Sequence, residues 1–252
     1  MQRWFKRSSL LLILVLSPLA SSASVAGGET PIEIVEAQPE LQLKPFKAYY
    51  QAQFDLGISL SGEVVRELKA LPDGQWQLSM KASAIMARID ESSRFEIRQQ
   101  QLYPLHYSYL RKVFGKKKQR QQQFDWSAGN VVSSQTDRST TLPIDQNTHD
   151  KVSYQIQLWR DLDAGLSEMH YQLVDGDHLK QLDFLRIGEE IVDTPAGRFE
   201  TIRVERDRGD NSARKTTLWF AKNLDHVIVK LQQIETDNKE YTLLLERIDT
   251  PD

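Results

Sequence analysis

The chain has no cysteine among its 252 residues. Its stability therefore depends on a packed core and not on disulfide bonds, and thiol catalysis and cysteine metal sites are excluded. The spacings HExxH, GxSxG, GxxxxGK[ST] and GxGxxG, which mark several classes of enzyme, are also missing. Asp175-Gly176-Asp177-His178 lacks the further ligands of a calcium loop and is typical of a hairpin turn. The sequence thus predicts no catalytic residue, no metal and no cofactor.

No apolar run is long enough for a stable membrane span. The longest, Leu10–Leu16, follows the basic residues Arg3, Lys6 and Arg7 and precedes Ser21-Ser22-Ala23, a small-residue cleavage site. This order is typical of a secretory signal peptide, which predicts residues 1–23 as a cleaved segment and a periplasmic mature protein without a transmembrane span. An uncleaved anchor is the alternative. Lipid attachment is excluded, because it needs a cysteine.

The net charge excludes a class of binding partner. The formal net charge is −3, and removing residues 1–23 takes away three basic residues and no acidic one. A mildly acidic mature protein is a poor general binder of nucleic acid or of an anionic membrane, and we expect no nucleic-acid partner. Residues 24–44 follow with two glycines, two prolines and four glutamates, which predicts a flexible leader outside the folded domain.

The folded part shows a period of two residues. From Phe46 to Leu56 every second residue is apolar, and the alternation continues from Ile58 to Leu68 and from Trp76 to Met86, with the turn Leu71–Gly74 between. Such alternation predicts strands with one buried face, and tight turns between them predict an antiparallel meander. Pro104 cannot donate a ladder hydrogen bond, so it must stand at a strand start, an edge or a bulge.

One segment fits two structures. Between Asp150 and Asp163 the apolar residues match either a strand or a helix, but the adjacent pair Leu158-Trp159 and the length favour a helix that Asp150 caps and Gly165 ends. Residues 137–148 are typical of a loop. Further strands follow up to Leu245, with turns at Thr194–Gly197 and Asp207–Ser212.

The stretches TPAGRFET (194–201) and TTLWFAKNLDHVIVKL (216–231), the latter after Arg214 and Lys215, resemble the DUF3108 family of bacterial envelope proteins. The resemblance covers about Pro45 to Asp249. His226-Val227 stands where the family often has a proline, which puts a kink there in doubt. The family has no agreed activity, so the resemblance implies a fold and a location and no chemistry.

These patterns predict one mainly β domain, residues 45–249. We expect a strongly curved antiparallel sheet, or an open or closed β-barrel, of about twelve strands with one helix packed on or in its concave side. A two-sheet β-sandwich is the alternative.

The candidate ligand-binding residues are aromatic or basic. The aromatic ones could line an apolar cavity, although core packing is the commoner role of tryptophan. The basic run could hold an anion, although it could equally be a solvated hairpin whose lysines prevent strand-to-strand aggregation. The candidates are Trp126, Trp159, Trp219, Phe220, Lys116, Lys117, Lys118 and Arg120.

The sequence favours a non-enzymatic periplasmic protein that binds a lipid, a polyanionic glycan or a partner protein with its concave face. An envelope polysaccharide hydrolase, or an assembly factor without a pocket, is the alternative. Buried acids or a His–Asp pair meeting in a cleft would favour the enzyme, whereas a cavity without convergent titratable groups would favour binding.

Overall fold

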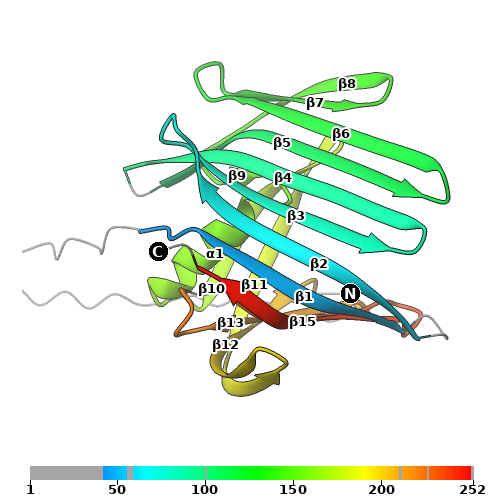
Figure 1. The fold of residues 1–252 in the computed structure, drawn as a ribbon. Helices are drawn as coiled ribbons and strands as arrows, with labels where there is room; N and C mark the ends of the chain where they lie inside the picture. The colour runs from blue at the N-terminus through cyan, green and yellow to red at the C-terminus, as the bar shows by residue number, and fades with distance from the viewer. Residues whose placement is uncertain (1–41, 56–58, 100, 210–211, 226, 251–252) are drawn as a thin grey trace, which may run out of the picture. The chain divides into compact units, whose positions relative to one another are not determined.

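The computed structural model describes residues 42–55, 59–99, 101–209, 212–225 and 227–250. The predicted signal peptide, most of the predicted leader and His226 lie outside these ranges. Fifteen strands form one sheet in the order β8-β7-β6-β5-β4-β3-β2-β1-β15-β14-β13-β12-β11-β10-β9 (Figure 1). Every neighbouring pair is antiparallel except β9 and β10. The sheet is strongly curved, as the sequence predicts, and its two end strands are not paired with each other.

The first half of the chain forms a meander. Its strands are β1 (Phe46–Asp55), β2 (Ser59–Ala70), β3 (Trp76–Ala84), β4 (Ala87–Arg98), β5 (Gln101–Val113), β6 (Lys116–Asp125), β7 (Asn130–Gln135) and β8 (Arg138–Pro143). The predicted alternation is confirmed here, because Ala48, Tyr50 and Ala52 on β1 are each at most 1% exposed, with polar residues between them.

The second half forms a similar meander that runs back to β1. After β9 (Thr148–His149) come β10 (Glu168–Asp175), β11 (His178–Thr194), β12 (Gly197–Asp207), β13 (Lys215–Ala221), β14 (Ile228–Ile234) and β15 (Glu240–Asp249). Because β15 pairs with β1, the two halves are continuous in one sheet.

The ambiguous segment is a helix, α1 (Tyr154–Asp163). The Asp150 carboxylate accepts hydrogen bonds from the backbone N–H groups of Val152 and Ser153, both 2.8 Å long, and so stabilises the turn that leads into the helix. The N-cap itself is Ser153, which makes no side-chain capping bond, so the predicted cap at Asp150 is wrong. At the other end Gly165 has a φ of +81° and donates to Leu162, which ends the helix.

The helix lies inside the curve of the sheet (Figure 1). Its Gln155 contacts Arg66 on β2, while its Tyr154 stacks on Phe184 of β11 with ring centroids 5.7 Å apart. These two strands are far apart in the sheet order, so a helix that touches both must lie on the concave face. Its apolar residues Ile156, Leu158, Trp159 and Leu162 join the main core.

Side chains fill the seam where the two ends of the sheet approach. Gln122 of β6 donates to the carbonyl of Val174 at the end of β10, at 3.0 Å. A small apolar cluster of Phe124, Val131 and Val174 packs beside this contact. The sheet is thus rolled like a barrel and held at its seam by side chains.

Three expectations need correction. The strands number fifteen and not about twelve, partly because residues 137–148, predicted as a loop, contain β8 and the start of β9. The strand predicted to reach Met86 ends at Ala84, and Met86 lies in the turn. The two-sheet sandwich is wrong, since all strands belong to one sheet.

The prediction for Pro104 is confirmed. Pro104 lies in a central strand at a register shift, which is the bulge that its missing N–H requires.

Within the described ranges, no helix has the length and apolar character needed to cross a bilayer.

Candidate functional site

Three arginines act electrostatically on Tyr154, the first residue of α1. Burial raises the pKa of the Tyr154 hydroxyl, and the positive charges of Arg206, Arg66 and Arg208 oppose this rise. Arg66 is 8% exposed on β2, Arg206 is half-buried on β12, and Arg208 follows the end of β12. We call these three residues the arginine cluster.

No residue of the arginine cluster makes a hydrogen bond or ion pair with a carboxylate among the described residues, although Glu235 attracts Arg208, and Asp183 and Asp175 attract Arg206, from farther away. Arg66 donates to the Gln155 amide oxygen at 2.6 Å, and Arg208 donates to the Thr216 hydroxyl at 3.0 Å and to the Arg214 carbonyl at 3.3 Å. The guanidinium of Arg206 makes no hydrogen bond or ion pair within those ranges, and its buried Nε has no acceptor. Guanidinium groups that are partly desolvated and unpaired by carboxylates form a site complementary to an anion.

The charges in this region repel one another. The pKa of Arg208 is lowered to about 10 by burial first, and then by the charges of Arg206 and Arg214. Burial likewise lowers the pKa of Arg206, with the charge of Arg214 acting in the same direction. Because the folded chain holds these cations at a cost, a bound anion would stabilise it.

The local fold explains why these arginines face inward. Arg66 pairs with Ala48 on β1 and with Met80 on β3, both on the concave face, and Arg206 pairs with the buried Phe184 on β11. In each case the arginine occupies a position that strand alternation assigns to the inside.

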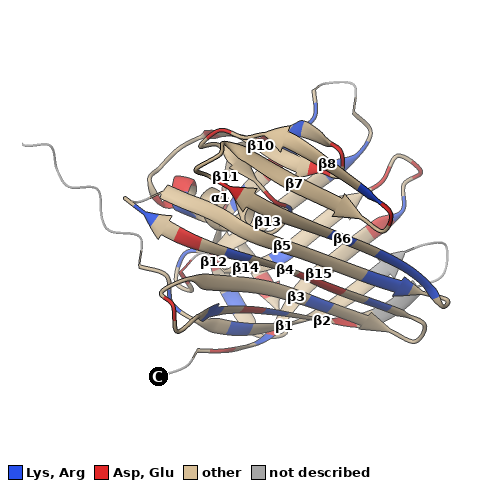
Figure 2. Cartoon of the chain, turned by 90° about the horizontal axis from the view of Figure 1, so that it is seen from above, with Lys and Arg blue, Asp and Glu red and all other residues tan. Residues whose placement is uncertain are grey.

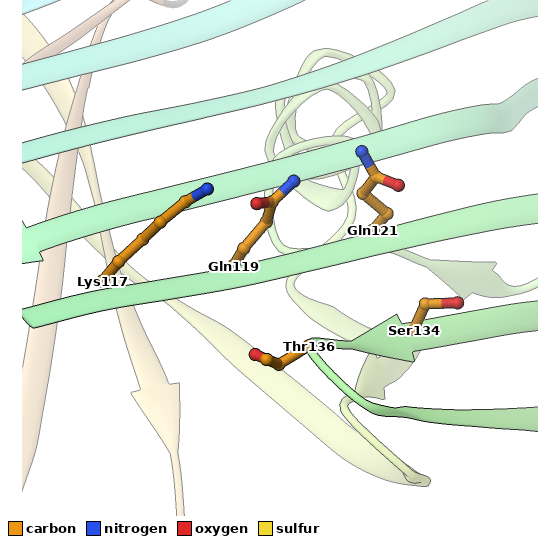
Figure 3. A pocket seen from close by; sticks show the side chains of 5 residues that line it. All are labelled: Lys117, Gln119, Gln121, Ser134 and Thr136. Atoms are coloured by element: carbon orange, nitrogen blue, oxygen red, sulfur yellow. The ribbon is translucent and has the colours of Figure 1, made fainter.

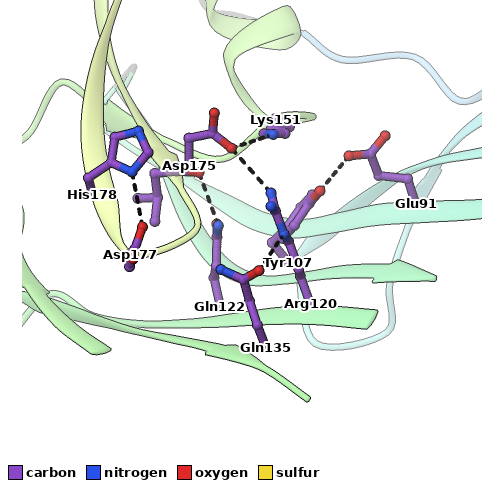
Figure 4. Close-up of polar contacts among 10 residues, drawn as sticks. Glu91, Tyr107, Arg120, Gln122, Gln135, Lys151, Asp175, Asp177 and His178 are labelled. Atoms are coloured by element: carbon purple, nitrogen blue, oxygen red, sulfur yellow. Dashed lines mark hydrogen bonds and ion pairs between the residues drawn. The ribbon is translucent and has the colours of Figure 1, made fainter. Parts of the chain in front are cut away.

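A second group of charges flanks the helix start on the other side (Figure 4). Asp175 accepts from Lys151 at 2.5 Å and from Arg120 at 3.2 Å, and Arg120 also donates to Gln135 at 3.1 Å. Burial alone would raise the pKa of Asp175, but the hydrogen bond and charge of Lys151 and the charge of Arg120 outweigh it and lower the pKa. This group joins β6, β7 and β10 across the seam.

Between the two groups lie acids with raised pKa values. The Tyr107 hydroxyl donates to Glu91 at 2.5 Å (Figure 4). Burial raises the pKa of Glu91 to about 7, against the opposing effect of this hydrogen bond, and the charge of Asp150 raises it further. Burial also raises the pKa of Asp150, although Ser93 and the helix N–H groups oppose it. Glu91 therefore carries only part of a negative charge near neutral pH.

The seam contains a polar cleft of about 360 Å³. It is lined by Arg120, Ser133, Gln135, Arg138, Thr140, Asp175, Gly176, Asp177 and His178. The Ser133 hydroxyl and the amide oxygen of its cross-strand neighbour Gln122 are buried, and neither has a hydrogen-bond partner among the described residues. Buried polar atoms of this kind are satisfied by water or by a polar ligand.

Two grooves lie on the outer face. One, of about 380 Å³, is lined by Lys117, Gln119 and Gln121 of β6 with Ser134 and Thr136 (Figure 3). The other, of about 300 Å³, crosses β2 to β5. The three β6 side chains occupy every second position, so they share the face opposite to Arg120.

The predicted aromatic residues lie in packed surroundings. Trp159 and Phe220 belong to the main core with exposures of 7% and 1%. Trp219, which alternates with Phe220 on β13, is 5% exposed and also belongs to the main core; Lys230 lies over its ring at 4.4 Å, and its indole donates to Glu190. Trp126 is half-buried at the seam and donates to Pro104 at 2.7 Å. None of the four presents a free ring face to the arginine cluster.

The predicted basic run divides between two faces. Lys116, Lys118 and Arg120 alternate with Lys117, so the first three face inward and Lys117 faces outward. β7 pairs with β6 only from Arg120 onward, which leaves the lysines as a local edge. Of these candidates, only Arg120 belongs to the network beside α1.

The sequence interpretation missed Arg66, Arg206 and Arg208. A signal was present, because Arg66 interrupts the apolar series Val64, Leu68 and Arg206 follows Ile202 and Val204 at the same spacing. A charged residue at an inward position of a strand is rarely buried without a reason.

The two features that would favour an enzyme, converging buried acids and a His–Asp pair in a cleft, are only partly present. Buried acids do approach each other, as an enzyme would require, but the Asp150 carboxylate already accepts hydrogen bonds from the Ser93 hydroxyl and from the backbone N–H groups of Val152 and Ser153. The pair His178–Asp177 at the cleft is 3.1 Å apart, and its side chains are exposed neighbours in one turn. Among the described residues, no group of three or more acids or histidines could hold a metal ion.

Comparison with solved structures supports the fold. A beta-barrel-like DUF1849 protein from Brucella abortus matches with a TM-score of 0.58 and 11% identity, over 84% of this chain and 99% of that one. An exported-protein candidate with a YmcC-like fold from Bacteroides fragilis and a lipoprotein candidate from Parabacteroides distasonis also match. Each has a TM-score of 0.33 and 11% identity over 82% of this chain, and over 97% and 96% of its own.

Among curated proteins, none matches the chain. The family model described as protein of unknown function, DUF3108, matches residues 49–246, which is most of the chain and includes both stretches that carry the resemblance. The chain therefore belongs to the DUF3108 family.

Proposed function

We propose that this is an exported, non-enzymatic envelope protein that binds an anionic envelope component on the concave face of its sheet. The observation that carries the proposal is the arginine cluster, whose guanidiniums make no hydrogen bond or ion pair with a carboxylate among the described residues. Phosphate or carboxylate groups of a lipid or a glycan fit this chemistry, because a planar guanidinium binds both with paired hydrogen bonds.

The sequence supports export. The basic residues, apolar run and small-residue site of residues 1–23 are those of a signal peptide, and they lie outside the described residues. In the periplasm the ligand would be an envelope lipid, an envelope glycan or a group on a partner protein. The polar cleft at the seam, with its unpartnered Ser133 hydroxyl, could receive the uncharged part of a glycan.

Native mass spectrometry of protein purified from its own periplasm tests the proposal. We expect a co-purifying anionic molecule that is lost from the variant Arg206→Gln. The matched control is Arg203→Gln on the same strand, because Arg203 occupies an alternate position and pairs with Glu205 instead of facing Tyr154. Identical spectra for native and delipidated protein, or equal loss from both variants, would count against the site.

Glu91 supports a second candidate, an envelope polysaccharide hydrolase. A carboxyl group with a pKa of about 7 can donate a proton at neutral pH, which is the task of a general acid in glycoside hydrolysis. Release of reducing ends from purified envelope glycan, abolished by Glu91→Gln and retained by Glu96→Gln, would favour this candidate over binding alone.

A further inference from the structure

Two neighbouring hairpin turns expose large apolar side chains. Ile85 and Met86 form the turn between β3 and β4 and are 101% and 60% exposed, while Phe114 in the turn between β5 and β6 is 73% exposed. The backbone N–H of Phe114 donates to the carbonyl of Met86 at 3.1 Å. The three side chains therefore belong to one end of the rolled sheet, which we call the apolar tip.

The backbone at Phe114 makes this exposure costly. Phe114 has a φ of +46° and Gly115 a φ of +78° in a two-residue hairpin turn. Turns with positive φ at both central positions favour Asn-Gly, and a bulky side chain in the left-handed region is strained. Phe114 gains no burial within the chain that would offset this strain, so its aromatic ring is not explained by folding.

The two hairpins that carry the apolar tip are mainly basic, although Asp90 pairs with Arg88 at 2.7 Å and Glu63 of β2 lies opposite Ser83. Residues 81–89 and 111–120 include no aspartate or glutamate. Exposed cations in these segments are Lys81, Arg88, Arg111, Lys112, Lys116, Lys117 and Lys118. Figure 2 shows basic residues gathered at the ends of β5 and β6 beside their shared turn. Apolar side chains at a tip and cations behind them match the two layers of a lipid surface, acyl chains and anionic headgroups.

We propose that the apolar tip docks this protein on a bilayer surface that carries anionic lipid headgroups. Ile85, Met86 and Phe114 enter the boundary between headgroups and acyl chains, and the lysines behind them contact lipid phosphates. Neither the arginine cluster nor its ligand takes part in this contact, so the docking surface stands independently of the proposed function.

Co-sedimentation with vesicles tests the apolar part of the surface. The protein is purified from the periplasm of an expressing bacterium and mixed with vesicles of phosphatidylglycerol and phosphatidylethanolamine, or of phosphatidylcholine alone. We expect binding to the anionic vesicles and a loss of about tenfold or more in the double variant Met86→Ser, Phe114→Asn. Asparagine suits the turn, so the variant should keep the fold, which thermal unfolding checks.

The matched control removes exposed apolar residues elsewhere. Ile191 and Leu166 are 54% and 43% exposed on other parts of the chain, and the variant Leu166→Ser, Ile191→Asn should bind the vesicles like the wild type. Equal losses in the tip variant and in this control would overturn the proposal, as would a wild-type protein that does not sediment with anionic vesicles.

A charge variant separates a bilayer from a soluble polyanion. Lys117→Glu with Lys118→Glu should weaken vesicle binding as well, whereas Lys69→Glu, an exposed lysine on β2, should not. If the lysine variant loses binding while the tip variant binds normally, the surface recognises charge alone and docking through inserted side chains is wrong. A Phe114→Trp variant whose fluorescence shifts to the blue with anionic vesicles supports insertion.

Discussion

Replacing Arg206 by glutamine should make the ligand-free protein more stable. Arg206 is half-buried, has no hydrogen-bond or ion-pair partner among the described residues, and repels Arg208. Glutamine keeps part of the side-chain length and removes the charge. Most substitutions of partly buried residues destabilise a protein, so an increase is a distinctive expectation.

The expected size follows from the repulsion in the arginine cluster. The pKa of Arg208 is lowered to about 10 from 12.5, with burial as the largest cause and Arg206 as the next. Both side chains are partly exposed, so solvent screens their repulsion to about 1 kcal/mol. For a domain of this size, a gain of about 1 kcal/mol raises Tm by about 2–4 °C.

The same substitution should weaken anion binding. A ligand present at about 100 times its Kd stabilises the folded state by about 2.7 kcal/mol. A hydrogen bond to a charged group contributes about 1.5–3 kcal/mol, so losing one guanidinium should raise Kd by about tenfold or more. The variant should thus unfold at a higher temperature than the wild type without ligand, and gain less when ligand is added.

Thermal unfolding with inorganic pyrophosphate as the probe measures both effects. Sodium chloride at matched ionic strength controls for screening, and Arg203→Gln controls for the loss of an arginine from β12. A lower Tm of Arg206→Gln without ligand would refute the repulsion argument. Equal stabilisation of all three proteins by pyrophosphate would show that the arginine cluster does not bind this anion.

Three further outcomes follow from single residues. Burial raises the pKa of Glu91 from 4.5 to about 7, so its contribution to stability falls as pH rises through this window; Glu91→Gln should flatten the unfolding free energy against pH by on the order of 2 kcal/mol. Phe114→Asn should raise the free energy of unfolding by about 1 kcal/mol in urea titrations, because it relieves a positive φ. Gly176→Ala and Gly74→Ala should each destabilise by about 1 kcal/mol, since their φ values are +75° and +77° and the Gln135 amide 2.7 Å from the first Cβ is the end of a flexible side chain that can shift; a much larger loss in Gly176→Ala would show that the hydrogen bond between Gln135 and Arg120 resists this shift.

The sequence predicted the sheet well because strand alternation is a local property. Along β1 every second residue is apolar and faces the core, so the buried face can be identified from neighbouring residues alone. The turns are marked by turn-forming residues, such as Pro195 and Gly197. The ambiguous helix could be assigned from the adjacent pair Leu158-Trp159 and from Gly165, which ends it, although its start lies a few residues after the predicted cap at Asp150. Strand alternation, turns and helix ends can all be predicted without knowing which strands pair in the sheet.

The sequence could not predict the seam and the site to the same extent. β8 was missed because its six residues, RSTTLP, include only one large apolar side chain, and its inner face packs on just a small cluster. The arginine cluster joins β2, β12 and α1, which are brought together by the curvature of the sheet alone. Alternation states that Arg66 and Arg206 face inward, but not that they face the same tyrosine.

Arg208 and the apolar tip lie at the same end of the rolled sheet, whereas Arg66 pairs with Ala48 near the other end of β1. β1 ends at Asp55, opposite Glu240, and the antiparallel pairing from β15 to β12 places the end of β12 at Asp207, just before Arg208, on the same side of the sheet. The turns at Ile85 and Phe114 lie there too, because adjacent strands of the meander reverse direction at each hairpin. Two unusual features lie at this end: Phe114 is exposed at positive φ, and Arg208 makes no ion pair with a carboxylate among the described residues. Departures of this kind gather at functional sites, since selection for folding alone would remove them.

If the apolar tip docks on a bilayer, an anionic group that enters the concave face from this end would come from the membrane side. A substitution that weakens binding at the apolar tip should leave binding at the arginine cluster intact, and the reverse should also hold.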